Sequence, residues 1–114
     1  MATDQLSLTF AALADPTRRA MLARLAEDGE VTVNELAEPF PLTVQAISKH
    51  LKVLERAGLI ARGRHAQLRP ARLEGAALRD AAGWIERYRD VWAGRLERLA
   101  LRIDEIQRKA ADDE

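Results

Sequence analysis

Apolar residues recur at helical spacing along most of this chain, and capping signals divide them into separate helices. The pattern predicts a first helix over about residues 4–13, and a second that begins at Asp15-Pro16 and ends before Gly29. The side chains of these two helices that are expected to face inward are Leu6, Phe10, Leu13, Met21, Leu22 and Leu25. The chain therefore begins as a small helical domain.

Two further helices follow in close succession. Residues 32–35, Thr-Val-Asn-Glu, have the form of a capping box, which opens a short helix that must stop before Pro39. The next helix is predicted over about residues 43–57, because a threonine caps its start and Gly58 stops its end. A short helix followed at once by a longer one predicts a helix-turn-helix over about residues 32–57.

The hydrophobic period changes after the fourth helix. Residues 59–62 predict a strand, residues 63–66 a turn and residues 67–69 a second strand. Pro70 would have to lie on an exposed edge or end the strand, because proline cannot donate a ladder hydrogen bond. The hairpin predicts a wing over about residues 59–73.

The C-terminal segment, about residues 75–110, is predicted to form one helix, or two if it breaks near Gly83. Its apolar residues recur at alternating spacings of four and three, the pattern of a coiled-coil seam: Trp92, Leu96, Leu99, Ile103, Ile106 and Ala110. The seam could fold back on its own domain. A helix of about thirty residues spans roughly 45 Å, however, which exceeds what so small a domain can cover. A second copy of the chain is the economical partner, and Phe10 is assigned to the same dimer interface.

Together these elements predict a mainly α fold with a small β-hairpin, that is, a winged helix-turn-helix with N- and C-terminal dimerisation helices. The 114 residues fit a single domain, residues 1–114, whose core covers residues 3–73.

Composition narrows the function classes. No apolar run approaches the roughly 20 residues that a membrane span needs, and the N-terminus lacks a signal-peptide pattern, so we expect a cytoplasmic protein without a membrane partner. The absence of cysteine excludes disulfides, thiolate metal sites and a cysteine nucleophile. No phosphate-cradling glycine loop, histidine–carboxylate cluster or activated-serine motif is present, so an enzyme is not expected.

The formal net charge of zero conceals a strong segregation. Residues 1–42 carry a charge of −4, residues 43–72 a charge of +6 and residues 73–114 a charge of −2. A positive block between two negative segments is the footprint expected for a polyanion ligand. A solvated basic face is the alternative interpretation.

The helix over residues 43–57 divides into two faces when it is wound at 100° per residue. One face is apolar and is expected to anchor the helix to the core: Val44, Ile47, Leu51 and Leu54. The opposite face is polar and basic: Gln45, Lys49, Lys52 and Arg56. Residues near the start of such a helix enter the major groove most deeply. The candidates for base contacts are therefore Thr43, Gln45, Ser48 and Lys49.

Arg62, Arg64 and His65 are expected to gather at the tip of the hairpin, where Gly63 eases the turn. A basic wing can lie against the minor groove or its phosphates. The sequence therefore predicts that the chain binds double-stranded DNA through the helix and the wing. An ordinary amphipathic helix beside a solubilising hairpin remains possible, as does a winged helix used only for protein contacts.

Two segments of the chain, residues 10–19 (FAALADPTRR) and residues 46–59 (AISKHLKVLERAGL), resemble the ArsR/SmtB family of bacterial winged-helix regulators. The resemblance covers roughly residues 8–110, and the segment 84–92 is further similar to a metal-independent branch of that family. It implies a dimeric repressor that overlaps its target promoter. It also implies that Gln45, Ser48 and Lys49 occupy base-reading positions.

The chain departs from the family's metal sensors. Paired cysteines are absent from residues 31–35, and no histidine follows residue 73. His50 and His65 lie in different elements and are poor candidates for a shared site, so no metal or other cofactor is expected and the effector is unknown. His50 is interpreted as a residue on the flank of its helix or a phosphate contact.

Overall fold

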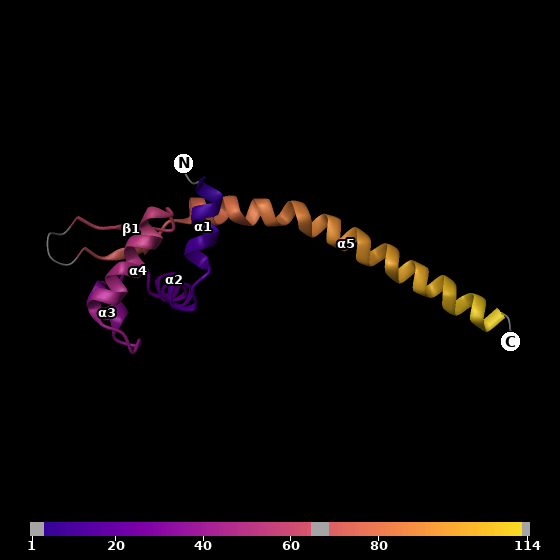
Figure 1. Cartoon of the computed structure of the whole chain (residues 1–114), viewed down its shortest axis with the longest axis horizontal. Helices are drawn as coiled ribbons and strands as arrows, with labels where there is room; N and C mark the ends of the chain where they lie inside the picture. Colours follow the sequence, from indigo (N-terminus) through magenta and orange to yellow (C-terminus); the bar gives the residue numbers. More distant parts are fainter. Residues whose placement is uncertain (1–3, 65–68, 113–114) are drawn as a thin grey trace. The chain divides into compact units, whose positions relative to one another are not determined.

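Seven regular elements follow one another in the computed structural model, which describes residues 4–64 and 69–112. They are α1 (Gln5–Leu13), α2 (Pro16–Asp28), α3 (Val33–Ala37), α4 (Val44–Arg56), β1 (Ile60–Arg62), β2 (Ala71–Leu73) and α5 (Gly75–Asp112). Figure 1 shows the helices and the hairpin along the chain. The chain divides into two compact units, residues 1–81 and residues 82–114. The predicted order of helices, helix-turn-helix, hairpin and C-terminal helix is confirmed.

Local capping explains where the first four helices begin. Asp4, Asp15, Thr32 and Thr43 each stand in extended backbone before a helix and accept a hydrogen bond from the amide three residues later. Each therefore satisfies one of the amide groups that a helix start leaves without a partner. At α3 the capping box is complete, because the Glu35 carboxylate also accepts from the Thr32 amide.

The core of the first unit lies between α2, α3, α4 and the strands. Its largest fully buried side chains are Met21, Leu25, Leu36, Ile47, Leu51, Leu54 and Leu59. The side-chain amide of Gln5, in α1, donates to the carbonyl of Ala57 at the end of α4. Gly58 follows with a φ of +74°, and the Leu59 amide donates to the Leu54 carbonyl at 3.0 Å, which closes the helix as a glycine-terminated cap.

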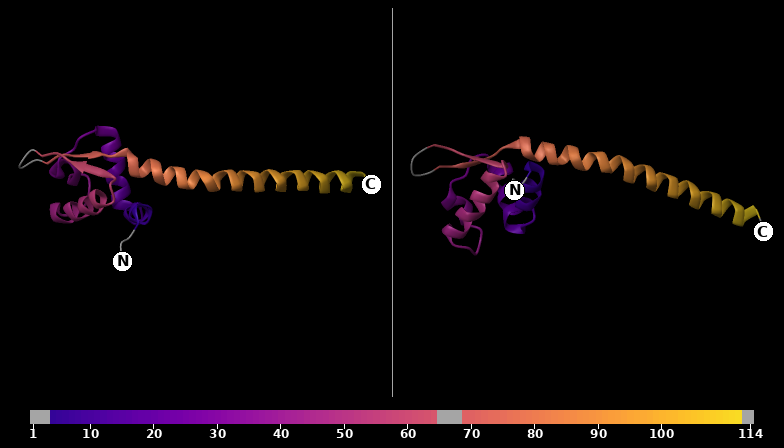
Figure 2. Two further views of the ribbon diagram at one scale, coloured as in Figure 1. Left: turned by 90° about the horizontal axis from the view of Figure 1, so that it is seen from above. Right: turned by 45° about the horizontal axis from the view of Figure 1, so that its top comes forward.

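The hairpin differs from the prediction. β2 covers residues 71–73, after Pro70. The strand was predicted over residues 67–69, of which 67 and 68 lie outside the described residues. β1 and β2 are antiparallel, with Ile60 opposite Leu73. The reason is long-range: Ala71 also exchanges two hydrogen bonds with Val31, and this pairing fixes the second strand beyond the proline. Figures 1 and 2 show the hairpin beside α4.

The α5 helix runs without interruption from residue 75 to residue 112, so the alternative of two helices broken near Gly83 is wrong. In the first unit, α5 contributes Ala77 and Ala81 as buried residues. In the second unit, residues 82–112 are helical throughout. No helix within the described residues combines the length and the apolar character that crossing a bilayer requires.

Candidate nucleic-acid interface

The α4 helix presents one apolar and one polar face, as its sequence predicts. Ile47, Leu51 and Leu54 are completely buried, whereas Gln45, Lys49 and Lys52 are exposed. Because three fully buried side chains hold the helix against the core, the polar face is carried on a fixed support.

The apolar face is narrower than expected at its first turn. Val44 is 43% exposed and lies at the margin of the face, so it does not anchor the helix. Thr43 is exposed, and its hydroxyl accepts the Ala46 amide at 3.1 Å as the cap of α4. Ser48 is half-buried. Thr43 and Ser48 nevertheless lie at the cap and in the first half of α4, which is the part of the helix that approaches a groove in helix-turn-helix proteins.

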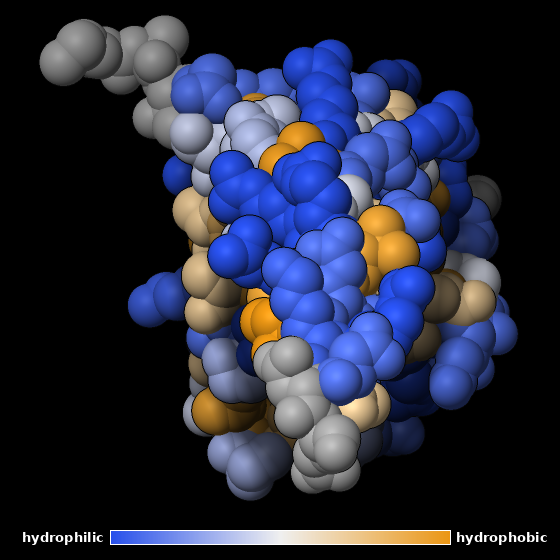
Figure 3. Space-filling view, turned by 90° about the vertical axis from the view of Figure 1, so that its right-hand side faces the viewer, coloured by the Kyte–Doolittle hydropathy of each residue, from blue (hydrophilic) through white to orange (hydrophobic). Residues whose placement is uncertain are grey.

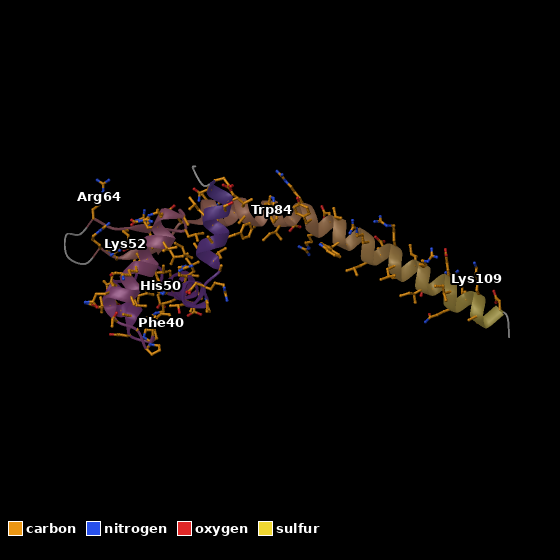
Figure 4. All side chains as sticks on the ribbon, viewed as in Figure 1. Phe40, His50, Lys52, Arg64, Trp84 and Lys109 are labelled. Carbon is orange, nitrogen blue, oxygen red and sulfur yellow. The ribbon has the colours of Figure 1, made fainter. Side chains whose placement is uncertain are left out.

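The structure describes two of the three basic residues that were expected around the tip of the hairpin, Arg62 and Arg64. Arg62 lies within β1 and is half-buried, and its Nε donates to the carbonyl of Arg69 at 3.0 Å. Burial and the charge of Arg69 both lower the pKa of the Arg62 guanidinium. Arg64 is exposed, and Figure 4 shows it on the hairpin beyond Lys52 of α4. His65 lies outside the described residues. Gly63 instead lies against Pro70, whose ring carbons are 3.1 Å from where a β-carbon would stand.

The two lysines of the α4 face form no ion pair with any residue that the structure describes. Among the residues that the structure describes, neither Lys49 nor Lys52 is within 4.0 Å of an acidic oxygen. Glu55, the single acidic residue between residues 43 and 72, instead faces Arg69 at 4.0 Å. Two lysines with uncompensated charge on one helix face can attract phosphates and reach base edges.

The same region matches known proteins. Residues 13–62 match a family model described as a helix-turn-helix domain. The chain is 36% identical over 76 residues to the transcriptional repressor SdpR of Bacillus subtilis, and the match covers 67% of this chain and 83% of that protein. An ArsR-like transcriptional regulator from Rhodococcus sp. RHA1 has a similar structure, with a TM-score of 0.72 and 32% identity over 89% of this chain and 92% of that one.

The chain belongs to the ArsR family of winged-helix transcriptional regulators. A further similar structure is the homodimeric winged helix-turn-helix DNA-binding domain Mb0332 from Mycobacterium bovis. It has a TM-score of 0.58 and 28% identity, and the match covers 82% of this chain and 83% of that one.

One group of contacts in this ArsR-family protein was not predicted from its sequence. The Arg18 guanidinium donates to the carbonyls of Ala11 and Ala12, at 3.1 and 2.7 Å, and a third nitrogen lies 3.3 Å from His50 Nδ1. Asp15 Oδ2 lies 4.0 Å from the same histidine nitrogen. His50 therefore connects α4 to the corner between α1 and α2, which favours the flank interpretation over a phosphate contact (Figure 4).

Asp15 is stabilised as a carboxylate in this corner. The hydrogen bond from the Arg18 amide, at 2.9 Å, lowers the pKa of Asp15 most, and the charges of Arg18 and His50 lower it further. A charged Asp15 caps α2 and faces the Arg18 and His50 side chains together. Asp15 and Arg18 belong to the segment 10–19 that resembles the family. They support α4 through His50 and are not part of the exposed face of that helix.

The predicted dimer seam is exposed in the second unit. Trp92, Leu96 and Leu99 are 61%, 62% and 54% exposed, and Ile103 is 47% exposed. The space-filling view shows apolar side chains at the surface between hydrophilic ones (Figure 3). Phe10, in α1, is half-buried. Large apolar side chains exposed at this spacing are typical of a surface that packs against another helix.

Proposed function

We propose that this ArsR-family regulator represses transcription by binding, as a homodimer, to an operator with inverted-repeat symmetry. The observation that carries the proposal is the exposed, uncompensated basic face of α4, which three buried residues hold in place. In each protomer, Gln45, Ser48 and Lys49 contact base edges in the major groove, while Thr43 and Lys52 lie beside them on the same helix. Arg62, Arg64 and His65 of the wing contact the neighbouring backbone or minor groove.

The dimer is supported by α5. Trp92, Leu96, Leu99 and Ile103 repeat at heptad spacing and are about half exposed in a single chain, which makes a second copy of the same helix the economical partner. A similar structure, Mb0332, is homodimeric. Phe10 of α1 contributes to the same interface. Residues 1–114 thus act as one winged-helix module with α5 as its dimerisation element.

Two-fold symmetry in the protein implies two-fold symmetry in the operator. We expect half-sites about 10–10.5 base pairs apart, or a multiple of that distance. The repressor role is supported by the similarity to SdpR. Because the target is chromosomal DNA, the protein acts in the cytoplasm.

The direct test is selection of bound duplexes from a random pool by the full chain. The proposal predicts enrichment of one imperfect inverted repeat. The proposal would be contradicted if no sequence is enriched and if the chain binds DNA at low salt no better than a non-specific protein does.

Base readout and backbone binding are separable by mutation. Gln45→Ala and Lys49→Ala should each relax the sequence preference, at about 1–3 kcal/mol for each hydrogen-bonded base that the variant no longer reads. Arg64→Ala should instead weaken every sequence alike. Repeating the selection with each variant measures the preference. Unchanged selection profiles for both α4 variants would exclude these residues from base readout.

Metal ions should not release the protein from its operator. The chain has no cysteine, and within residues 4–64 and 69–112 no group of three histidine, cysteine or acidic residues could hold a metal. Adding zinc, cadmium or arsenite to the bound complex should leave the mobility shift unchanged. A stoichiometric binding isotherm coupled to a fall in DNA affinity would contradict this prediction.

A further inference from the structure

A hollow of about 260 Å³ lies between the start of α3, the start of α4 and the hairpin. We call it the wing pocket. Its polar lining consists of Thr32, Asn34, Ser48, Arg62 and Arg69. The volume lies below the roughly 300–1,000 Å³ of pockets that hold drug-sized molecules, so the wing pocket suits a small group rather than a large ligand.

The wing pocket concentrates positive charge. Among the described residues, its lining includes two arginines and no acidic residue. The two arginines are held near each other, since Arg62 Nε donates to the main-chain carbonyl of Arg69. Glu55 offsets this charge only partly, from 4.0 Å. Two arginines that share one partial counter-charge favour an anion between them.

The backbone around Arg69 is held in an uncommon conformation. Arg69 has a φ of +28°, a region that side chains other than glycine rarely adopt. The Gly63 amide donates to the Pro70 carbonyl at 2.7 Å, and the two residues are in close contact. Packing at the base of the hairpin therefore holds the backbone that carries Arg69 into the pocket. Local strain of this kind is concentrated at functional sites.

Neutral donors complete the lining. Within the described part of the chain, neither the Ser48 hydroxyl nor the Asn34 amide makes a hydrogen bond. The Thr32 hydroxyl, in contrast, donates to Glu35 at 2.8 Å and caps α3. Two guanidinium groups with two unengaged polar groups beside them match the oxygens of a phosphate.

We propose that the wing pocket binds one phosphate group of the operator backbone in each half-site, where the strand passes from the recognition helix to the wing. This proposal rests on the proposed function, because it needs DNA on the α4 face. It assigns Arg69, which no sequence pattern singles out, to the DNA interface. The Ser48 hydroxyl then contacts the DNA backbone in addition to a base edge.

The test asks whether the effect of changing Arg69 depends on one particular phosphate of each half-site. Arg69→Gln, which keeps much of the length of the side chain, is compared with the wild-type chain on the selected operator and on duplexes that carry a methylphosphonate at the same backbone position of both half-sites, with one such position tested in each duplex. We expect Arg69→Gln to weaken operator binding about tenfold. At one position per half-site, where the neutral group removes the phosphate charge, the two proteins should bind equally.

Arg72→Gln is the matched control. Arg72 lies in the same hairpin and carries the same charge, but it is paired with Glu74 at 3.5 Å and does not line the pocket. We expect Arg72→Gln to weaken operator binding less than Arg69→Gln does. That weakening should remain when the phosphate that contacts Arg69 is replaced by a methylphosphonate. Ser48→Ala should weaken binding about threefold, and that effect should disappear at the same phosphate as the Arg69 effect. Circular dichroism establishes that each variant is folded.

Two results would overturn the proposal. One is equal operator affinity for wild type and Arg69→Gln; the other is a constant weakening on every methylphosphonate duplex. Titration of the free protein with inorganic phosphate, followed by the Ser48 amide resonance, separates the sources of phosphate. If the Ser48 amide resonance shifts saturably with phosphate, but the Arg69→Gln effect persists on every methylphosphonate duplex, the pocket binds a free anion. That result would contradict a contact with DNA. Failure of the selection itself would refute the proposed function instead.

Discussion

Leu99→Asp should convert the protein to a monomer and abolish specific operator binding, although Leu99 need not touch DNA. The substitution places an unpaired charge in the centre of the α5 seam, where burial against a second copy is costly. Leu99 is already 54% exposed in the single chain and does not belong to the buried core, so the substitution spares the fold of the first unit. Sedimentation equilibrium measures the mass and a mobility shift measures binding to the selected operator.

The matched control is Leu101→Asp. Leu101 is 57% exposed in the same helix, but it lies about 200° around the axis from Leu99 and outside the seam. This variant should remain dimeric and bind the operator as the wild type does. Because dimerisation and folding can be linked, circular dichroism accompanies both proteins. A folded, monomeric Leu99→Asp protein that binds the operator with wild-type affinity would rule out this role for α5.

Operator binding should weaken about 1,000-fold when the salt concentration rises from about 0.1 to 0.4 M. Neutralising about six phosphates per dimer releases the counterions condensed on them, which gives a slope of log K against log salt near −5. The motivation is the charge of +6 over residues 43–72 and the absence of ion pairs on Lys49 and Lys52 within the described chain. Equilibrium titrations at four or more salt concentrations measure the slope.

A variant tests the origin of that slope. Arg64→Ala should reduce its magnitude by about one unit for each phosphate that the side chain neutralises in the wild type. Arg108→Ala, a change of the same kind in the exposed part of α5, should leave it unchanged. A slope near zero for the wild type would favour the alternative of a winged helix used for protein contacts, whose apolar interfaces respond little to salt.

Local chemistry explains which parts of the fold were predictable. The caps at Asp15, Thr32 and Thr43 act on amides three residues away, so they are visible in a short stretch of sequence. Helical spacing likewise identified Ile47, Leu51 and Leu54 as the buried face of α4. These signals determined the starts of the helices and the exposed face that forms the candidate site.

The strand at residues 71–73 was not predicted, because the register of the hairpin depends on a distant segment. Residues 67–69 have an alternating pattern, but the second strand begins at Ala71, which pairs both with Arg62 and with Val31, forty residues earlier. Such long-range pairing leaves no mark in a local window.

The role of His50 was also beyond local sequence patterns. Its contacts with Arg18 and Asp15 join residues more than thirty positions apart. The sequence did contain a signal, since Asp15 and Arg18 both belong to the motif that resembles the family. The motif indicated that these positions belong together but not that they support the recognition helix through its inner flank.

The exposed seam of α5 also has a consequence for gene dosage. Where most chains are monomeric, mass action makes the concentration of dimer follow the square of the concentration of chain. Halving the amount of this regulator would then lower the occupancy of an unsaturated operator about fourfold rather than twofold. A promoter under its control would switch over a narrower range of expression than a monomeric repressor allows, and dilution during cell growth would be enough to release it.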